Sequence, residues 1–251
     1  MSRYRIVSLL TLGGLAATVI VTAASSAERQ PARAVIELFT SQGCSSCPTA
    51  DRLLGELAND PSLVAISVPI DYWDYLGWKD TLAKPQHTAR QRHYAHMRGD
   101  REVYTPQVVV NGVAHVLGSD RAAIERAIQR TRAQEGVLVV PVTLERAGDG
   151  VIVSLPASGV NGVRGEVWLC ALVKQINVAI PRGENRGRAV SYHNVARRWV
   201  KLGEWNGAAQ SRTIPLSDFN ADGIDAVAVI VQSGSADKPG RMIGAAIASL
   251  D

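Results

Sequence analysis

Two cysteines separated by two residues give this sequence its clearest chemical signal. They lie in Gly43-Cys44-Ser45-Ser46-Cys47-Pro48, between a predicted buried strand and a predicted helix. Two thiols at this spacing on the first turn of a helix can close a small disulfide, and the helix N-terminus stabilises a thiolate over a thiol. We therefore expect an exposed Cys44 that attacks a partner and a Cys47 that resolves the mixed disulfide.

Zinc sites use the same CxxC spacing, which leaves metal handling as an alternative. Zinc normally needs a second pair of ligands, and the only other cysteine, Cys170, lies in an apolar run that predicts a buried, inert thiol. His93 and His96 could supply ligands, although solvated surface histidines are the plainer interpretation. Copper(I) is the soft ion that two thiolates favour. Our expectation is redox chemistry with no metal site and no bound cofactor.

A second feature is Tyr104-Thr105-Pro106, at the start of a predicted strand. Because proline cannot donate to a sheet ladder, it belongs at the first residue of a strand or at an edge. Here it resembles the Thr-Pro of thioredoxin-fold proteins, whose proline peptide is cis and packs beside the CxxC. The resemblance implies a cis Thr105–Pro106 bond, with Pro106 shaping the substrate face and the Thr105 backbone and Tyr104 contacting a bound peptide. An ordinary trans proline is the alternative.

Two further positions are candidates for roles around the sulfurs. Glu37 is the one charge in an apolar strand and could exchange a proton with Cys47, although a strand-end glutamate bonded to backbone or arginine is the simpler interpretation. Trp73 belongs to the aromatic cluster Asp71–Trp78, which follows the second predicted strand. This cluster either lines a groove for a partner or packs under a long loop.

Strands and helices alternate in the first half of the chain. Apolar runs predict strands at Ala34–Thr40, Leu63–Ile70, Gln107–Val110 and Val113–Leu117, and helical spacing predicts helices at Pro48–Asn59, Gln86–Met97 and from a Ser119 cap to Arg130. The order βαβαββα indicates α/β layers around a mixed sheet. With the two motifs, residues 28–135 resemble a thioredoxin-like domain.

After residue 135 the pattern changes to about seven short β-prone runs separated by turns, which predicts a second, β-sandwich-like domain over residues 136–251. This half contains the arginine-rich segment Arg182–Lys201, in which Glu184 is the only acid. The segment is interpreted as a loop folded back toward the thiol domain or as an anionic-ligand site, with a solvated hairpin as the plainer alternative.

Beyond its first 27 residues the chain resembles a family of secreted bacterial proteins that is defined as a domain of unknown function. The matching segments are ELFTSQGCSSCP from Glu37, DYWDYLGWKD from Asp71, Arg90-Gln91, YTPQVVVNG from Tyr104, RGENRGR from Arg182 and YHNV from Tyr192. The resemblance implies a fold and a location in the cell envelope but no substrate. Active thioredoxins carry an aromatic before the first cysteine and Gly-Pro between the two, so Gly43 and Ser45-Ser46 argue against reducing-thioredoxin behaviour.

The first residues predict export. Arg3 and Arg5 precede the apolar stretch Ile6–Ala23, and small residues then lead to a predicted cleavage after Ala27, as in a signal peptide over residues 1–27; an uncleaved anchor is the alternative. The 251 residues are 46% apolar and 20% charged, which excludes extended disorder. The formal charge of +4, half of it from the two N-terminal arginines, is too small to indicate nucleic-acid binding.

These observations predict a protein of the periplasm or the secreted fraction, with no stable membrane span after cleavage. It would be a thiol–disulfide oxidoreductase or redox-responsive protein whose partners are protein thiols or disulfides, or small thiols of the envelope. The alternative from another class is a binding or scaffold module in which the disulfide is a structural staple.

Overall fold

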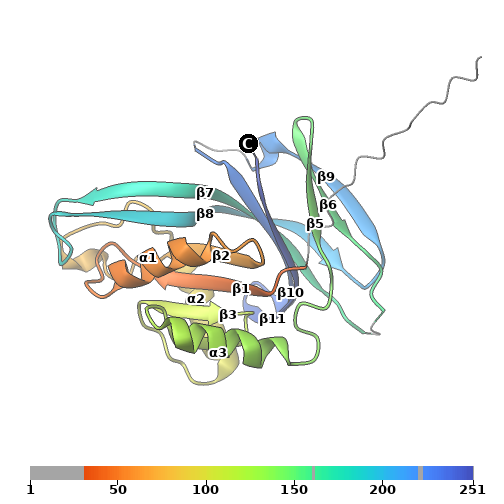
Figure 1. Ribbon diagram of the computed structural model, residues 1–251, viewed down its shortest axis with the longest axis horizontal. Coiled ribbons are helices and arrows are strands. Elements are labelled where there is room, and N and C mark those ends of the chain that lie inside the picture. The colour runs from red at the N-terminus through yellow and green to blue at the C-terminus, as the bar shows by residue number, and fades with distance from the viewer. Residues whose placement is uncertain (1–30, 160–161, 220–222, 251) are drawn as a thin grey trace, which may run out of the picture.

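The chain is built around one large mixed sheet. The computed structural model describes residues 31–159, 162–219 and 223–250, so the predicted signal peptide lies outside the described residues. The sheet has eight strands in the order β11-β10-β7-β8-β2-β1-β3-β4, and a second sheet has the order β5-β6-β9 (Figure 1). The elements are β1 (Ala34–Thr40), α1 (Cys47–Leu57), β2 (Leu63–Pro69), a short 3-10 helix (Asp74–Leu76), α2 (Pro85–Arg98), β3 (Gln107–Val110), β4 (Ala114–Leu117), α3 (Arg121–Arg132), β5 (Thr143–Ala147), β6 (Gly150–Leu155), β7 (Gly165–Ile180), β8 (Arg188–Trp205), β9 (Gln210–Pro215), a second 3-10 helix (Leu216–Asp218), β10 (Ala226–Ser235) and β11 (Lys238–Ser249).

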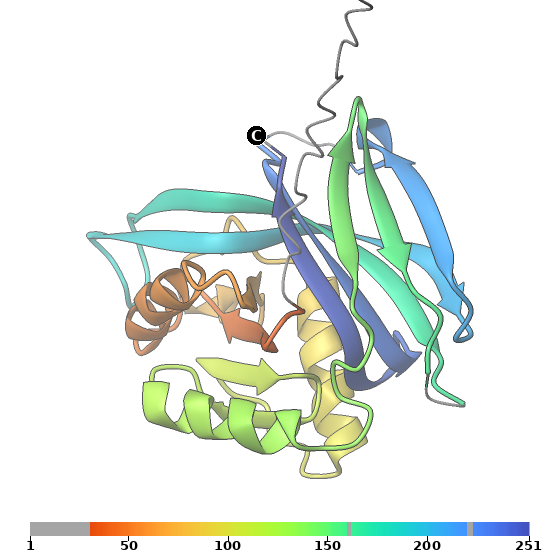
Figure 2. The same ribbon diagram turned by 45° about the vertical axis from the view of Figure 1, so that its right-hand side comes forward.

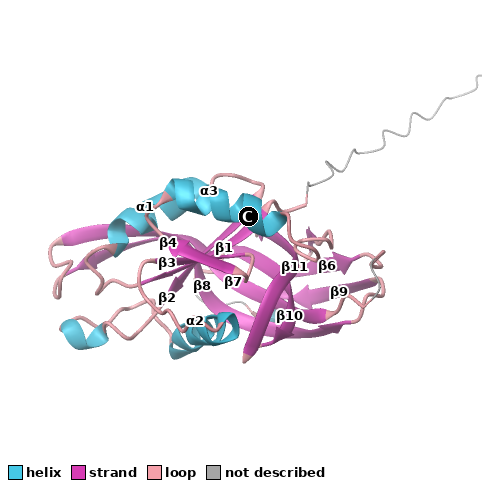
Figure 3. Ribbon diagram, turned by 90° about the horizontal axis from the view of Figure 1, so that it is seen from below, coloured by secondary structure: helices cyan, strands magenta, loops and turns pink. Residues whose placement is uncertain are grey.

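Helices cover both faces of the first-half strands. Figure 3 shows α1 and α3 on one face and α2 on the other. All seven residues of β1 are buried, and successive side chains of a strand point to opposite faces. Ile36 and Leu38 accordingly pack in the core beneath α1 and α3, whereas Phe39 packs with Tyr94 of α2. A strand buried on both faces requires the continuous apolar run that the sequence has.

The second half of the chain extends the same sheet. β7 and β8 form a hairpin of 16-residue and 18-residue strands, and β8 joins β2 in parallel through the pair Ser67 and Val195. The predicted β-rich region is therefore found, but it does not form a sandwich separate from the first half. The sheet β5-β6-β9 packs instead on β7, β10 and β11, around a core that includes Val153, Leu169 and Val229 (Figure 2).

The element order predicted for the first half is confirmed, with differences at the ends. Asp120, rather than Ser119, caps α3, because its carboxylate accepts the Ala123 N–H at 2.8 Å. The segment before β5 bonds to β11, through the N–H groups of Leu138 and Val140 and the carbonyl oxygens of Met242 and Ile243, without forming a regular strand. The division at residue 135 stays a prediction. None of the described helices has the length and apolar character needed to cross a membrane.

Candidate functional site: a buried disulfide at the start of α1

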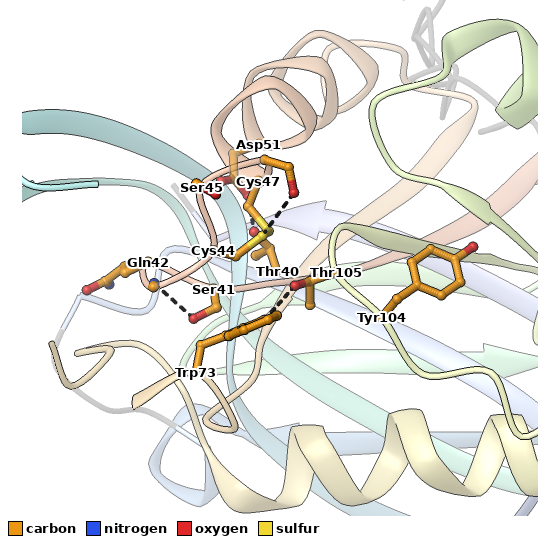
Figure 4. Close-up of a disulfide and its surroundings, with 12 residues drawn as sticks. Thr40, Ser41, Gln42, Cys44, Ser45, Cys47, Asp51, Trp73, Tyr104 and Thr105 are labelled. Atoms are coloured by element: carbon orange, nitrogen blue, oxygen red, sulfur yellow. Dashed lines mark hydrogen bonds between the residues drawn. A yellow bond between two sulfur atoms is a disulfide. The ribbon is translucent and has the colours of Figure 1, made fainter. Parts of the chain in front are cut away.

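Cys44 and Cys47 form a disulfide at the N-terminus of α1, with their Cα atoms 5.4 Å apart (Figure 4). Cys47 is the first residue of the helix and Pro48 the second, where a missing N–H costs little. Cys44 is only 4% exposed and Cys47 is fully buried. The expectation of an exposed Cys44 is therefore wrong, although Cys44 is the more accessible of the two.

The turn between β7 and β8 covers the disulfide. Asn185, itself 1% exposed, donates its side-chain amide to the carbonyl oxygens of Gln42 and Cys44, at 2.9 and 2.8 Å. The Glu184 carboxylate accepts the Ser45 N–H at 3.3 Å. The first part of the arginine-rich segment is therefore a loop folded back onto the cysteines, which is one of the interpretations that the sequence allowed. The sequence could not reveal this contact, because it joins residues about 140 positions apart.

A second clamp fixes the chain just before Cys44. The Gln42 N–H donates to Asp80 at 2.7 Å, and the Trp78 indole donates to the Gln42 side-chain oxygen at 2.8 Å. Asp80 also accepts the N–H groups of Leu82 and Ala83. Burial raises the pKa of Asp80, while these three N–H groups oppose the shift. The clamp and the hairpin turn together hold the CxxC segment in one conformation.

The Thr105–Pro106 peptide is cis, as predicted. Trp73 connects this segment to the cysteine loop, because its indole donates to Thr105 Oγ1 at 2.7 Å and its Cβ lies 3.0 Å from where a Cβ on Gly43 would be (Figure 4). The glycine before Cys44, where active thioredoxins have an aromatic, thus makes room for Trp73. The structure brings together Cys44, Cys47, Trp73 and Thr105.

Tyr104 and Gln91 make their contacts at the Thr105–Pro106 segment and the strands beside it, away from the sulfurs. The Tyr104 hydroxyl bonds His115 Nδ1 at 2.9 Å, and in Figure 4 its ring points away from the disulfide. Gln91 donates to the Tyr104 carbonyl oxygen and to Gln107, at 2.8 and 2.9 Å. Gln91 therefore holds the Thr-Pro segment from α2, a role that sequence analysis missed.

Glu37 is not placed with the sulfurs. Its carboxylate accepts two bonds from Arg90, at 2.6 and 3.2 Å, and one from the Tyr94 hydroxyl at 2.6 Å. These partners belong to α2, which lies on the opposite face of the sheet from α1 (Figure 3). The free Cys170 is buried near this ion pair, and burial, followed by the Glu37 charge, raises its thiol pKa. The simpler interpretation of Glu37, an arginine-paired glutamate, fits this placement.

The carboxyl group that does accompany the disulfide is Asp51. It lies four residues after Cys47, on the same face of α1, and is 2% exposed (Figure 4). Its Oδ1 accepts the Thr40 hydroxyl at 2.7 Å, and its buried Oδ2 has no partner among the described residues. Burial, with a smaller contribution from Asp80, raises the pKa of Asp51 to about 8. The sequence does carry a signal for Asp51, because it is an acid within the apolar face of a predicted helix.

Metal ligands do not gather around the cysteines in the part of the chain that the structure describes. No three side chains of His, Cys, Asp and Glu among these residues lie close enough to hold an ion. His93, one of the ligands considered, places Nδ1 3.1 Å from the Ala236 carbonyl oxygen.

Comparisons with known proteins place the chain in a family. A crystal structure of an Agrobacterium tumefaciens protein is 33% identical, with a TM-score of 0.77 over 87% of this chain and 94% of that one. HBP35 of Porphyromonas gingivalis shares the fold at 14% identity, with a TM-score of 0.56 over 88% of this chain and 76% of its own. No curated protein matches the sequence. The family described as protein of unknown function (DUF1223) matches residues 35–232, and the chain belongs to it.

Proposed function

We propose that this protein is an exported, thioredoxin-like thiol–disulfide exchange protein of the periplasm or the secreted fraction. One observation carries the proposal: the Cys44–Cys47 disulfide begins a helix beside the Thr105–Pro106 segment, with Trp73 joining the two. A disulfide at a helix N-terminus favours release of a thiolate. A neighbouring extended segment offers backbone groups to a partner peptide. The partners would be protein or small thiols and disulfides of the envelope.

The exchange step uses groups that the site contains. A partner thiolate attacks Cys44 Sγ and forms the mixed disulfide, while the electron pair of the broken S–S bond goes to Cys47 Sγ. A thiolate at the fully buried position of Cys47 is unfavourable, so the leaving sulfur must take up a proton. Asp51 is largely protonated at neutral pH, because burial raises its pKa to about 8, and it supplies that proton. In the reverse direction Asp51 accepts the proton as Cys47 attacks the mixed disulfide.

Access to Cys44 requires movement of the hairpin turn. With Cys44 at 4% exposure, a protein partner reaches its sulfur when Asn185 and Glu184 release the cysteine loop. This release breaks three hydrogen bonds, two of which satisfy carbonyl oxygens that would then bond to water or to the partner.

The decisive test is mixed-disulfide trapping with Cys47→Ala in the exporting organism. Without its resolving thiol, Cys44 should retain partner proteins as adducts that a reductant releases. Cys44→Ala is the matched control, since it leaves Cys47 buried and Cys170 unchanged, and it should retain none. Failure of Cys47→Ala to retain any partner, together with a wild-type disulfide that does not exchange with a dithiol, would contradict the proposal.

The burial of both sulfurs favours a second candidate, a binding or scaffold module with a structural disulfide. The reduction potential separates the two. Structural disulfides in exported proteins typically lie below roughly −300 mV, whereas exchanging ones lie higher. Equilibration with dithiols of known potential, followed by thiol labelling, measures this value directly.

A further inference from the structure

Lys84, Arg197 and Arg198 form a group of positive charges near the end of β2. Lys84 immediately precedes α2, and its N–H donates to the Pro69 carbonyl oxygen at 3.4 Å. β8 pairs with β2 through Val195, so Arg197, two residues further along β8, lies beside the same end of β2. Two segments more than a hundred residues apart therefore bring three cations together.

An irregularity in the pairing of β8 with β7 lies at the two arginines. Arg198 pairs with Ala171 of β7 and Ala196 pairs with Leu172, which leaves Arg197 as an extra residue without a partner position. Such a bulge redirects side chains and breaks the strict alternation between faces. The charges of both arginines reach the Lys84 ammonium, whose pKa is lowered by burial first and then by these two charges.

No carboxylate neutralises this group within the described residues, since none of the three cations belongs to an ion pair there. Among the residues that the structure describes, neither the buried Arg197 Nη1 nor the Trp199 indole N–H has a hydrogen-bond partner. The Trp199 ring stacks against Arg90, 4.8 Å from its guanidinium carbon. Buried donors without acceptors and unpaired like charges are both costly, and one bound anion would relieve both.

His87 is the neighbouring titratable group on α2. It is 1% exposed, and its Nδ1 donates to the Pro69 carbonyl oxygen at 2.9 Å. Burial, followed by the nearby cations Lys84, Arg90 and Arg197, lowers its pKa to about 4. His87 is therefore neutral and adds no competing charge to the group.

We propose that Lys84, Arg197 and Arg198 bind a small tetrahedral oxyanion of the phosphate and sulfate class, free or as the terminal group of a larger molecule. A guanidinium presents paired donors that match two oxygens of such an ion. The first turn of α2 adds little to this site, because Pro85 has no N–H and the His87 N–H donates to the Lys84 carbonyl oxygen at 2.9 Å. This site is separate from the disulfide and does not depend on the exchange function.

Calorimetric titration of the full mature protein with inorganic phosphate tests the site. Arg197→Gln and Lys84→Gln should each weaken binding about tenfold or more, as expected for loss of a charge-assisted contact. Arg146→Gln, an exposed arginine on β5, is the matched control and should bind like the wild type. A parallel titration with glycerol phosphate distinguishes the sources. If glycerol phosphate binds more tightly than inorganic phosphate, the natural ligand is a larger molecule with a terminal phosphate. If the two bind equally, it is the free ion.

Thermal unfolding supplies a second readout that a structural role would not reproduce. Without phosphate, Arg197→Gln should unfold at the same temperature as the wild type or higher, because the variant removes repulsion. With saturating phosphate the order should reverse, since only the wild type gains full binding energy. Absence of phosphate binding to the wild type, or equal binding by both variants and the control, would overturn the proposal. These results are independent of whether Cys44 and Cys47 exchange.

Discussion

The carboxyl group of Asp51 lies one helical turn beyond Cys47 on α1, and both side chains are buried. Thr40, at the end of β1, donates its hydroxyl to Asp51 and fixes the carboxyl group from the sheet. The second carboxyl oxygen has no partner in the described part of the chain and can carry a proton. This relationship couples the redox state of the disulfide to the protonation of one acid, and it leads to two predictions.

Asp51→Asn should slow reduction of the disulfide by dithiothreitol about a hundredfold at pH 7, as is typical when a general acid is lost. The leaving Cys47 thiolate would then lack its proton donor. In the wild type, the rate constant per reductant thiolate should fall as the pH rises through about 8, because Asp51 loses its proton there. Rapid thiol labelling measures both. Glu56→Gln, an exposed acid on the same helix, is the control, and equal rates in all three proteins would exclude Asp51 as the donor.

Asp51 should also make the oxidised protein less stable as the pH rises. Its folded pKa of about 8 lies above its ordinary value, so its stabilising contribution is complete below about pH 4 and is lost through pH 8. His87, with a pKa lowered to about 4, gives the opposite slope up to about pH 6.5. Between pH 6.5 and 8 the free energy of unfolding should therefore fall by about 1 to 2 kcal/mol because of Asp51.

Urea unfolding across this range measures the effect, and Asp51→Asn should remove it. Burial raises the pKa of Asp80 as well, which contributes a slope of the same sign in both proteins. The difference between the two curves thus reports Asp51 together with its interaction with Asp80. Parallel curves would show that Asp51 titrates alike in the folded and unfolded chains.

Sequence patterns predict the elements here better than the contacts between them. The apolar run of β1 and the two short runs that form β3 and β4 are local signals, and both lead to the predicted structure. The extension of the first-half sheet by β8 depends on a single pairing between strands, Ser67 with Val195, which periodicity cannot reveal. The part of β7 next to the hairpin turn gives only a weak apolar signal, because after Val173 exposed positions alternate with half-buried ones.

The candidate site likewise contains residues that a local motif reveals and residues that only contacts between distant segments reveal. The cysteines and Thr105–Pro106 carry their own local motifs, so the sequence identifies them. Asn185 carries no such signal, because its function arises from burial against Cys44. Glu37 was associated with the sulfurs from its place in the strand before them, but alternation turns its side chain toward Arg90.

Asn185→Ala should increase the rate at which dithiothreitol reduces the disulfide, by about tenfold, because the hairpin turn then no longer holds the cysteine loop. The variant leaves two carbonyl oxygens without their donor, which should lower the free energy of unfolding by about 1 to 3 kcal/mol. Arg186→Ala, an exposed neighbour in the same turn, is the control for both measurements. An unchanged reduction rate in a destabilised Asn185→Ala would show that the turn does not limit access to Cys44.

Glu37→Gln separates a structural role for this residue from a role in proton transfer. The carboxylate is fully buried and paired with Arg90, so its loss leaves a guanidinium charge without its partner. Breaking a buried pair in this way typically costs about 3 to 5 kcal/mol, which thermal or urea unfolding would detect. The pH dependence of disulfide reduction should nevertheless match the wild type, because Glu37 lies across the sheet from Cys47. A shifted pH profile in this variant would return the proton-transfer role to Glu37 and remove the need for Asp51.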